Sequence, residues 1–206
     1  MHSQLSPAAM RIATAATKHF AEFGYHGSSL NEIATAVGIK KASLYAHFSS
    51  KDELFMLVFE DALADEINFV TSCFEVDTEA GAEYYNKMKP RYTDSVSLRF
   101  LLHNAYLPPA HLRQRVIRGY QDYLHCLRTL YTAKLRQQPG LKHLTDKEQA
   151  HFAHAYLGII DSLHVELVYA NELSCDQNVS FDDRRTALWS MLQQSLHIAQ
   201  SQGHQG

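Results

Sequence analysis

The chain has 206 residues and a formal net charge of −3 at neutral pH, and 46% of its residues are apolar, with only five prolines and nine glycines. This composition excludes a disordered or low-complexity protein, and no apolar run approaches the roughly 20 residues needed to cross a bilayer. The start MHSQLSP lacks the basic-then-apolar form of a signal peptide, and three scattered cysteines (Cys73, Cys126 and Cys175) form no paired framework. We therefore expect a cytoplasmic globular protein with no membrane partner.

A first helix is predicted over residues 7–23. Ser6 can cap its start, and Pro7 suits the first helical position because an N–H there would have no helical partner. Apolar residues at helical spacing, including Ile12, Ala16 and Phe20, give this helix one face for a core.

The most informative stretch runs from Tyr25 to Glu53, YHGSSLNEIATAVGIKKASLYAHFSSKDE, and predicts a short helix, a sharp turn and a second short helix. Ser29 with Glu32 three residues later forms a capping-box pattern, so the first of these helices should begin at Leu30. Gly38 tolerates the positive φ that a sharp turn requires. This layout is typical of a unit that reads DNA.

The second short helix is predicted over residues 40–48. Its apolar residues, expected in the core, are Ala42, Leu44 and Phe48. Its polar residues can donate to phosphates or base edges; they are Lys40, Lys41, Ser43, Tyr45 and His47. No acid lies between Glu32 and Asp52, so the surface here should be positive although residues 1–55 carry a net charge of only +1.

At these residues the chain resembles the TetR family of bacterial transcription regulators. The family pattern F-x-x-x-G-Y, then [ST]-[ST]-[LV]-x-x-I-A-x-x-x-G-[VI], L-Y-x-H-F and S-K-x-E-L, is matched at Phe20–Tyr25, Ser28–Leu30, Ile33, Ala34, Gly38, Ile39, Leu44–Phe48 and Ser50–Leu54. One departure is Lys40, which stands where the family often has a capping Ser or Thr. The resemblance implies an all-α fold, with a three-helix helix-turn-helix domain in residues 1–50 and a larger effector-binding and dimerisation domain in residues 51–206.

The same resemblance implies double-stranded operator DNA as a partner. Lys41 and Lys51 are expected to hold phosphates, and Ser43 and Lys40 are the better candidates for base contacts. The remaining candidates, for phosphates or the groove edge, are Ser28, Ser29, Tyr45 and His47. We expect Tyr45→Ala or Lys51→Ala to weaken operator binding while leaving thermal stability nearly unchanged.

Further helices bring the expected number to about nine, with no convincing strand. The fourth should open at Ser50, in a capping box with Glu53, and continue to about Cys73. The others are predicted near residues 78–89, 91–106, 110–137, 145–171 and 182–201, and prolines or polar loops separate them.

The last two long helices predict a homodimer, because apolar residues surround the first of them on every side and one face therefore lacks a partner. Pairing both helices with their symmetry mates would give a four-helix bundle, as the family resemblance also implies. The candidate interface residues are Tyr156, Ile160, Leu167, Leu188, Leu192 and Leu196. A twofold dimer would read half-sites about 34 to 36 Å apart on a pseudo-palindromic operator. The alternative is that these helices form the centre of a monomeric bundle.

The larger domain is expected to bind a small, fairly hydrophobic effector that releases the repressor from DNA. His103, Tyr106 and Tyr123 are the candidate contacts, since each joins a ring to a polar tip. The alternative for each ring is ordinary core packing. No cofactor is expected.

Thirteen histidines leave a metal-responsive regulator open as an alternative. His151 and His154 stand three apart on one predicted helix, Asp161 and His164 repeat that spacing, and His103, His111 and His125 lie on neighbouring segments. Spacing alone is a weak signal, and no bound metal is expected. A helical metal-dependent enzyme could use the same residues, but the chain has no H-E-x-x-H or G-x-S-x-G motif, so we expect no enzyme activity.

Overall fold

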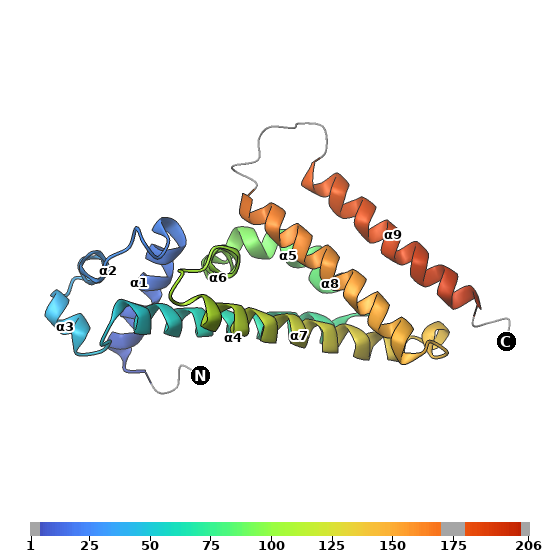
Figure 1. Ribbon diagram of the computed structural model, residues 1–206, viewed down its shortest axis with the longest axis horizontal. Coiled ribbons are helices and arrows are strands. Elements are labelled where there is room, and N and C mark those ends of the chain that lie inside the picture. Colours follow the sequence, from blue (N-terminus) through green and yellow to red (C-terminus); the bar gives the residue numbers. More distant parts are fainter. Residues whose placement is uncertain (1–4, 170–179, 203–206) are drawn as a thin grey trace. The chain divides into compact units, whose positions relative to one another are not determined.

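The computed structural model describes residues 5–169 and 180–202, and in these residues it consists of helices without strands (Figure 1). Its elements are α1 (Pro7–Phe23), α2 (Leu30–Ala36), α3 (Lys41–Tyr45), α4 (Lys51–Val76), α5 (Ala82–Asp94), α6 (Val96–Tyr106), α7 (Arg113–Gln137), the 3₁₀ turn η2 (Pro139–Leu141), α8 (Asp146–Tyr169) and α9 (Phe181–Gln202). The all-α prediction with about nine helices is confirmed. Cys175 lies outside the described residues.

The chain forms two compact units. The first unit comprises the described residues up to Asn68 together with Pro90–Tyr123, and the second comprises Phe69–Lys89 together with the described residues from Leu124 onward. These units follow the packing of the chain, whereas the boundary between residues 50 and 51 was inferred from the family resemblance. That functional boundary stays a prediction.

Aromatic side chains build the core of the first unit. Phe20 of α1, Phe55 and Phe59 of α4 and Phe100 of α6 are all fully buried. The ring of Phe55 lies edge-on to Phe20 at 5.2 Å and to Phe100 at 5.5 Å between centroids. Burying each such side chain contributes about 2–3 kcal/mol, and edge-to-face pairs add to this. The cluster therefore fixes α1, which precedes the predicted helix-turn-helix stretch, against α4 and α6.

Helices α8 and α9 lie side by side in the second unit (Figure 1). Tyr156, Ile160 and Leu163 of α8 are fully buried, and Leu192 and Leu196 of α9 are almost so. These residues form the unit's own core, where burial of each apolar side chain stabilises the packed helices.

Two predicted boundaries are wrong. A helix end was expected at Pro90, yet α5 runs through this proline to Asp94. Proline removes one backbone donor, but α5 ends within about one turn of it, and Ser95 then caps α6 by accepting a hydrogen bond of 3.0 Å from the Leu98 N–H. The recognition segment is also shorter than predicted, because regular helix is confined to Lys41–Tyr45 within residues 40–48.

The capping box at the start of α4 is only partly as predicted. Ser50 Oγ accepts from the Glu53 N–H at 3.1 Å, but the Glu53 carboxylate turns to Ser49 and accepts from its N–H at 2.6 Å and its hydroxyl at 2.5 Å. Ser50 thus makes the side-chain half of the capping box, and Ser49 supplies the backbone N–H of the other half.

No helix in the described part of the chain has the length and apolar character needed to span a membrane.

Candidate nucleic-acid interface

The start of α2 has the predicted capping box. Ser29 Oγ accepts from the Glu32 N–H at 3.2 Å, and Glu32 Oε2 accepts from the Ser29 N–H at 2.8 Å and from its hydroxyl at 2.6 Å. The Ser29 hydroxyl bond is the main reason why the pKa of Glu32 is lowered. Because Ser29 is exposed and its hydroxyl already has an acceptor, a phosphate here would compete with Glu32 for that donor.

The turn between α2 and α3 depends on Gly38, which has a φ of 74°. The Gly38 N–H donates to the Thr35 carbonyl and the Ile39 N–H to the Ala34 carbonyl, each at 3.0 Å. This is the Schellman arrangement, which satisfies the last carbonyls of a helix while reversing the chain direction. It directs α3 away from α2 so that α3 crosses the motif as a recognition helix does.

The segment from Lys40 to Phe48, which contains helix α3, has one buried and one exposed side. Leu44 and Phe48 are buried, whereas Ala42, predicted for the core, is exposed because two large side chains already fill the space beneath so short a helix. Tyr45 is 48% exposed. The other exposed candidates are Lys40, Lys41, Ser43 and His47. Their exposed side chains include two cations and an imidazole, so this face can meet a polyanion.

Lys40 stands at the N-cap of α3 and makes no side-chain capping hydrogen bond. The predicted loss of a cap at this position is confirmed. The side chain is instead exposed, so its charge remains available to a ligand.

Ser28 and Lys51 have partners within the protein itself. Ser28 is 4% exposed; its hydroxyl donates to the Gly24 carbonyl at 2.7 Å and lies 2.9 Å from Nδ1 of His19. This burial leaves little of the Ser28 hydroxyl for a phosphate, and the expected phosphate contact stays a prediction. Lys51 Nζ donates to the Ser28 carbonyl at 2.7 Å and lies 4.0 Å from the centroid of the Tyr25 ring. Burial lowers the pKa of Lys51, and its remaining N–H groups are left for a phosphate.

Sequence reasoning missed a contact from α1 to this motif. Arg11 Nη2 donates to the Val37 carbonyl at 3.1 Å, which satisfies a backbone acceptor at the end of α2. Arg11, Lys18 and His19 line a hollow of about 540 Å³ beside that helix end. The only signal in the sequence was that Arg11 and Lys18 lie seven positions apart, on one face of α1. Such a spacing of two cations is too common to predict the contact.

The effector candidates lie in the first unit. The hydroxyls of Tyr106 and Tyr120 are hydrogen-bonded at 2.9 Å. The ring centroids of Tyr120 and Tyr123 lie 5.7 Å apart, and Tyr123 is 1% exposed. The structure thus gathers Tyr106 and Tyr123 into one aromatic cluster, while His103 is half-buried on α6. A cavity of about 420 Å³ in this unit lies between α4 and α7 and has other lining residues, among them Phe59, Leu63, Arg115 and Arg118.

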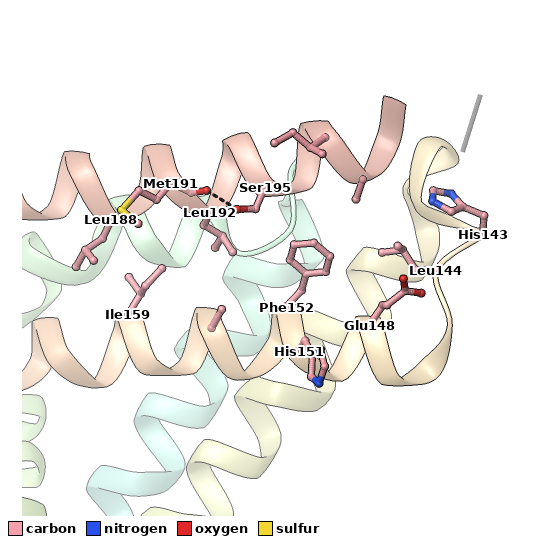
Figure 2. Close-up of a pocket in the computed structure, with 13 residues that line it drawn as sticks. His143, Leu144, Glu148, His151, Phe152, Ile159, Leu188, Met191, Leu192 and Ser195 are labelled. Atoms are coloured by element: carbon pink, nitrogen blue, oxygen red, sulfur yellow. Dashed lines mark hydrogen bonds between the residues drawn. The ribbon is translucent and has the colours of Figure 1, made fainter. Parts of the chain in front are cut away.

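A groove of about 650 Å³ separates α8 from α9 in the second unit (Figure 2). Leu188 and Leu192 of the predicted interface line it, opposite Phe152 and Ile159 of α8, as Figure 2 shows. Two groove residues on α9 are largely exposed, Met191 at 66% and Ile198 at 60%. The groove therefore presents an apolar surface to its surroundings.

Several predicted interface residues do not face that groove. Tyr156 and Ile160 are fully buried in the unit's own core, so they offer little surface to a second subunit, and their place at a subunit interface stays a prediction. Leu196 is 3% exposed, so little of its side chain is left for a partner, and Leu167 is half-buried. Because apolar residues occur on every side of α8, its sequence does not indicate which of them pack in the core of the unit.

The histidines do not gather into a metal site within residues 5–169 and 180–202, where no cluster of three or more His, Cys, Asp or Glu side chains has suitable geometry. His151 and His154 are exposed on α8. His164 is fully buried, and its Nε2 lies 3.1 Å from the Tyr84 hydroxyl. These positions give the metal-responsive alternative no support.

Comparison with known proteins agrees with this geometry. Residues 12–58 match the family model described as bacterial regulatory proteins, tetR family. The chain is 33% identical over 69 residues to the HTH-type transcriptional activator FasR of Mycolicibacterium smegmatis, a match that covers 34% of this chain and 32% of FasR. It is 41% identical over 51 residues to IcaR of Staphylococcus epidermidis, the negative transcriptional regulator of the biofilm operon icaADBC, covering 25% and 28% of the two chains. The chain thus matches about a third or less of each relative's length.

A similarity in fold extends over most of the chain. The crystal structure of the transcriptional regulator FadR from Bacillus subtilis, in complex with stearoyl-CoA, has a TM-score of 0.65 to this chain. The alignment covers 89% of this chain and 96% of FadR at 19% sequence identity. At that identity the likeness shows a shared fold.

Proposed function

The chain belongs to the tetR family of bacterial regulatory proteins through its residues 12–58, and from this premise we propose that it is a homodimeric transcriptional repressor which a small hydrophobic effector releases from its operator. The observation that carries DNA binding is the two-sided segment from Lys40 to Phe48, which contains α3: Leu44 and Phe48 are buried, while Lys40, Lys41 and Tyr45 are exposed. A short helix with this division, held behind a Schellman turn, can enter a major groove without losing its core contacts.

The charge of the module supports binding as a dimer. Residues 1–55 have a net charge of only +1, and phosphate neutralisation supplies most of the affinity of a protein for DNA. Two modules on one duplex double the number of cations and require two half-sites at once, which also raises specificity.

The second copy of the chain is proposed to cover the α8–α9 groove. Met191 and Ile198 are exposed on α9, and Phe152 and Ile159 line the same groove from α8 (Figure 2). Two such faces related by a twofold axis would bury both sets of apolar side chains in a four-helix arrangement. Leu188 and Leu192 stay in the proposed interface as groove-lining residues.

Sedimentation velocity at micromolar concentration tests the dimer. Met191→Glu should shift the protein toward monomer, because a charge would be buried without a partner. Gln194→Glu is the matched control, since this exposed α9 residue is absent from the groove lining. A wild-type protein that sediments as a monomer would remove the proposed interface.

The effector is proposed to bind near His103, Tyr106 and Tyr123, which combine aromatic rings with a few polar groups. Because the structurally similar FadR from Bacillus subtilis was crystallised with stearoyl-CoA, long-chain acyl-CoA thioesters are the first compounds to screen. Thermal-shift measurements on the whole protein would reveal a binder, as a ligand specific for the folded state raises the melting temperature.

DNA binding is tested with a labelled fragment from upstream of the protein's own gene. Fluorescence anisotropy in excess competitor DNA should show specific binding that weakens steeply as salt rises. FasR is named an activator and IcaR a negative regulator, so a promoter–reporter assay with and without the protein is needed to establish repression. Increased reporter output in the presence of the protein would reverse the proposed direction of control.

A further inference from the structure

One carboxylate oxygen in the first unit joins three separate segments. The Tyr25 hydroxyl, between α1 and α2, donates to Asp52 Oδ1 in the first turn of α4. His111 Nε2, between α6 and α7, lies 3.2 Å from the same Oδ1. The rings of Tyr25 and His111 are also in contact, with centroids 5.2 Å apart. Two donors from distant parts of the chain thus share one acceptor.

Tyr25 connects this oxygen to the DNA-reading motif. Its ring lies beneath the Lys51 ammonium, 4.0 Å from the centroid, and that ammonium donates to the Ser28 carbonyl immediately before the cap of α2. The position of Asp52 therefore fixes Tyr25, and Tyr25 fixes both a candidate phosphate contact and the chain that enters α2. Of the residues linked by these contacts, only His111 comes from outside the DNA-reading motif and the start of α4.

The electrostatics agree with this geometry. The Tyr25 hydrogen bond is the main reason why the pKa of Asp52 is lowered, and burial together with Asp52 raises the pKa of Tyr25 well above its usual value. Lys51 and His111 are the cationic or titratable groups next to the carboxylate, and His26 stacks edge-on against Tyr25. Asp52 is 42% and His111 48% exposed in their side chains, so the link can rearrange at lower cost than the buried Phe20–Phe55 cluster.

We propose that Asp52 is a positioning residue for DNA binding, and that His111 makes the geometry of the DNA-reading motif depend on the segment between α6 and α7. This inference rests on the proposed function. Tyr106, a candidate effector contact, is the last residue of α6 and stands five positions before His111. A ligand that moves the end of α6 would therefore change the positions of Tyr25 and Lys51 through the contact of His111 with Asp52.

An exposed His–Asp pair contributes little to stability by itself, so thermal stability separates positioning from structural support. Asp52→Asn and His111→Gln should each weaken binding to the upstream fragment by roughly five- to tenfold, the low end of couplings between separate sites, with little change in melting temperature. Combining Tyr25→Phe with His111→Gln should weaken binding less than the product of the single effects, because both donors act on one oxygen.

Glu60→Gln is the matched control. Glu60 is another exposed carboxylate of α4, and it accepts from Arg115 of α7 at 3.4 Å, so its replacement removes a second exposed carboxylate contact of α4 away from the motif. Its operator affinity should equal that of the wild type.

The outcomes separate the two proposals. A wild-type protein without specific DNA binding contradicts the proposed function itself. If the wild type binds specifically and His111→Gln binds with the same affinity, the positioning role is overturned. Equal losses of affinity in His111→Gln and Glu60→Gln also overturn it. If Asp52→Asn fails to fold, the exposed His111→Gln and its combination with Tyr25→Phe carry the test, and affinity losses that only follow losses of melting temperature also overturn it.

Discussion

Tyr156 donates a hydrogen bond of 3.0 Å to the Gly81 carbonyl across 75 positions of the sequence. Its ring approaches so closely that a β-carbon on Gly81 would lie 2.5 Å from ring carbon Cε2. Gly81 also has a φ of 78°, a backbone conformation that L side chains rarely adopt. Glycine is therefore required here for two independent reasons, and Tyr156 serves the core of the second unit.

Gly81→Ala should lower the free energy of unfolding by about 2–3 kcal/mol, because it adds both backbone strain and a steric clash with a fully buried ring. Urea unfolding at fixed protein concentration measures this. Gly158→Ala is the control, since a β-carbon there meets no described atom within 4 Å and helix propensity predicts a gain of about 0.5–1 kcal/mol. Equal changes in the free energy of unfolding for the two substitutions would show that the contact with Tyr156 does not determine the effect of Gly81→Ala.

The local elements could be predicted because their signals lie within a few residues. The capping box of Ser29 and Glu32 needs partners only three positions apart, and it fixed the start of α2 correctly. The contact of Ser28 with His19, nine positions away, and the contact of Asp52 with His111, 59 positions away, were not predicted. Local periodicity contains no information about such pairs, which depend on how the helices pack.

Lys40→Ser should separate stability from DNA binding. A serine at the N-cap of α3 could accept the hydrogen bond that Lys40 does not, which would stabilise the protein by up to about 1 kcal/mol. The same change removes an exposed cation from the proposed interface, so operator affinity should fall and depend less on salt. Thermal melts and anisotropy titrations at two salt concentrations measure the two effects. Unchanged affinity would exclude Lys40 from the interface.

Tyr45→Ala should weaken operator binding by roughly five- to 150-fold, as expected for a lost contact of about 1–3 kcal/mol. Tyr45 is 48% exposed, so the melting temperature should hardly change. Tyr45→Phe keeps the ring and removes the hydroxyl, and comparing the two variants by anisotropy shows which part contacts DNA. A large loss of stability in Tyr45→Ala would instead indicate a structural residue.

Lys51→Ala is now expected to differ from Tyr45→Ala, contrary to the sequence-based expectation for both. Loss of the 2.7 Å bond to the Ser28 carbonyl and of the contact with the Tyr25 ring should cost about 1 kcal/mol of stability in addition to DNA affinity. Chemical denaturation and anisotropy titrations on the same samples measure both. A variant as stable as the wild type would restore Lys51 to a purely DNA-facing role.

The second unit should lose stability in mild acid because of His164. Burial lowers the pKa of this fully buried histidine to about 4, whereas an unfolded histidine titrates near 6.5. Between these values the unfolded chain binds a proton that the folded protein refuses, so the free energy of unfolding falls as pH falls. At pH 5 the expected loss relative to pH 7 is about 2 kcal/mol.

Urea unfolding at pH 7 and pH 5 checks this loss in the wild type and in His164→Gln, where it should largely disappear because glutamine does not titrate. His154→Gln removes an exposed histidine of the same helix and should keep the full pH dependence. The lowered pKa values of capping carboxylates such as Glu32 and Glu148 matter only at lower pH, since their stabilising effect is lost as pH falls below the unfolded value of about 4.3. A wild-type protein equally stable at pH 5 and pH 7 would mean that His164 accepts a proton without leaving its buried position beside Tyr84.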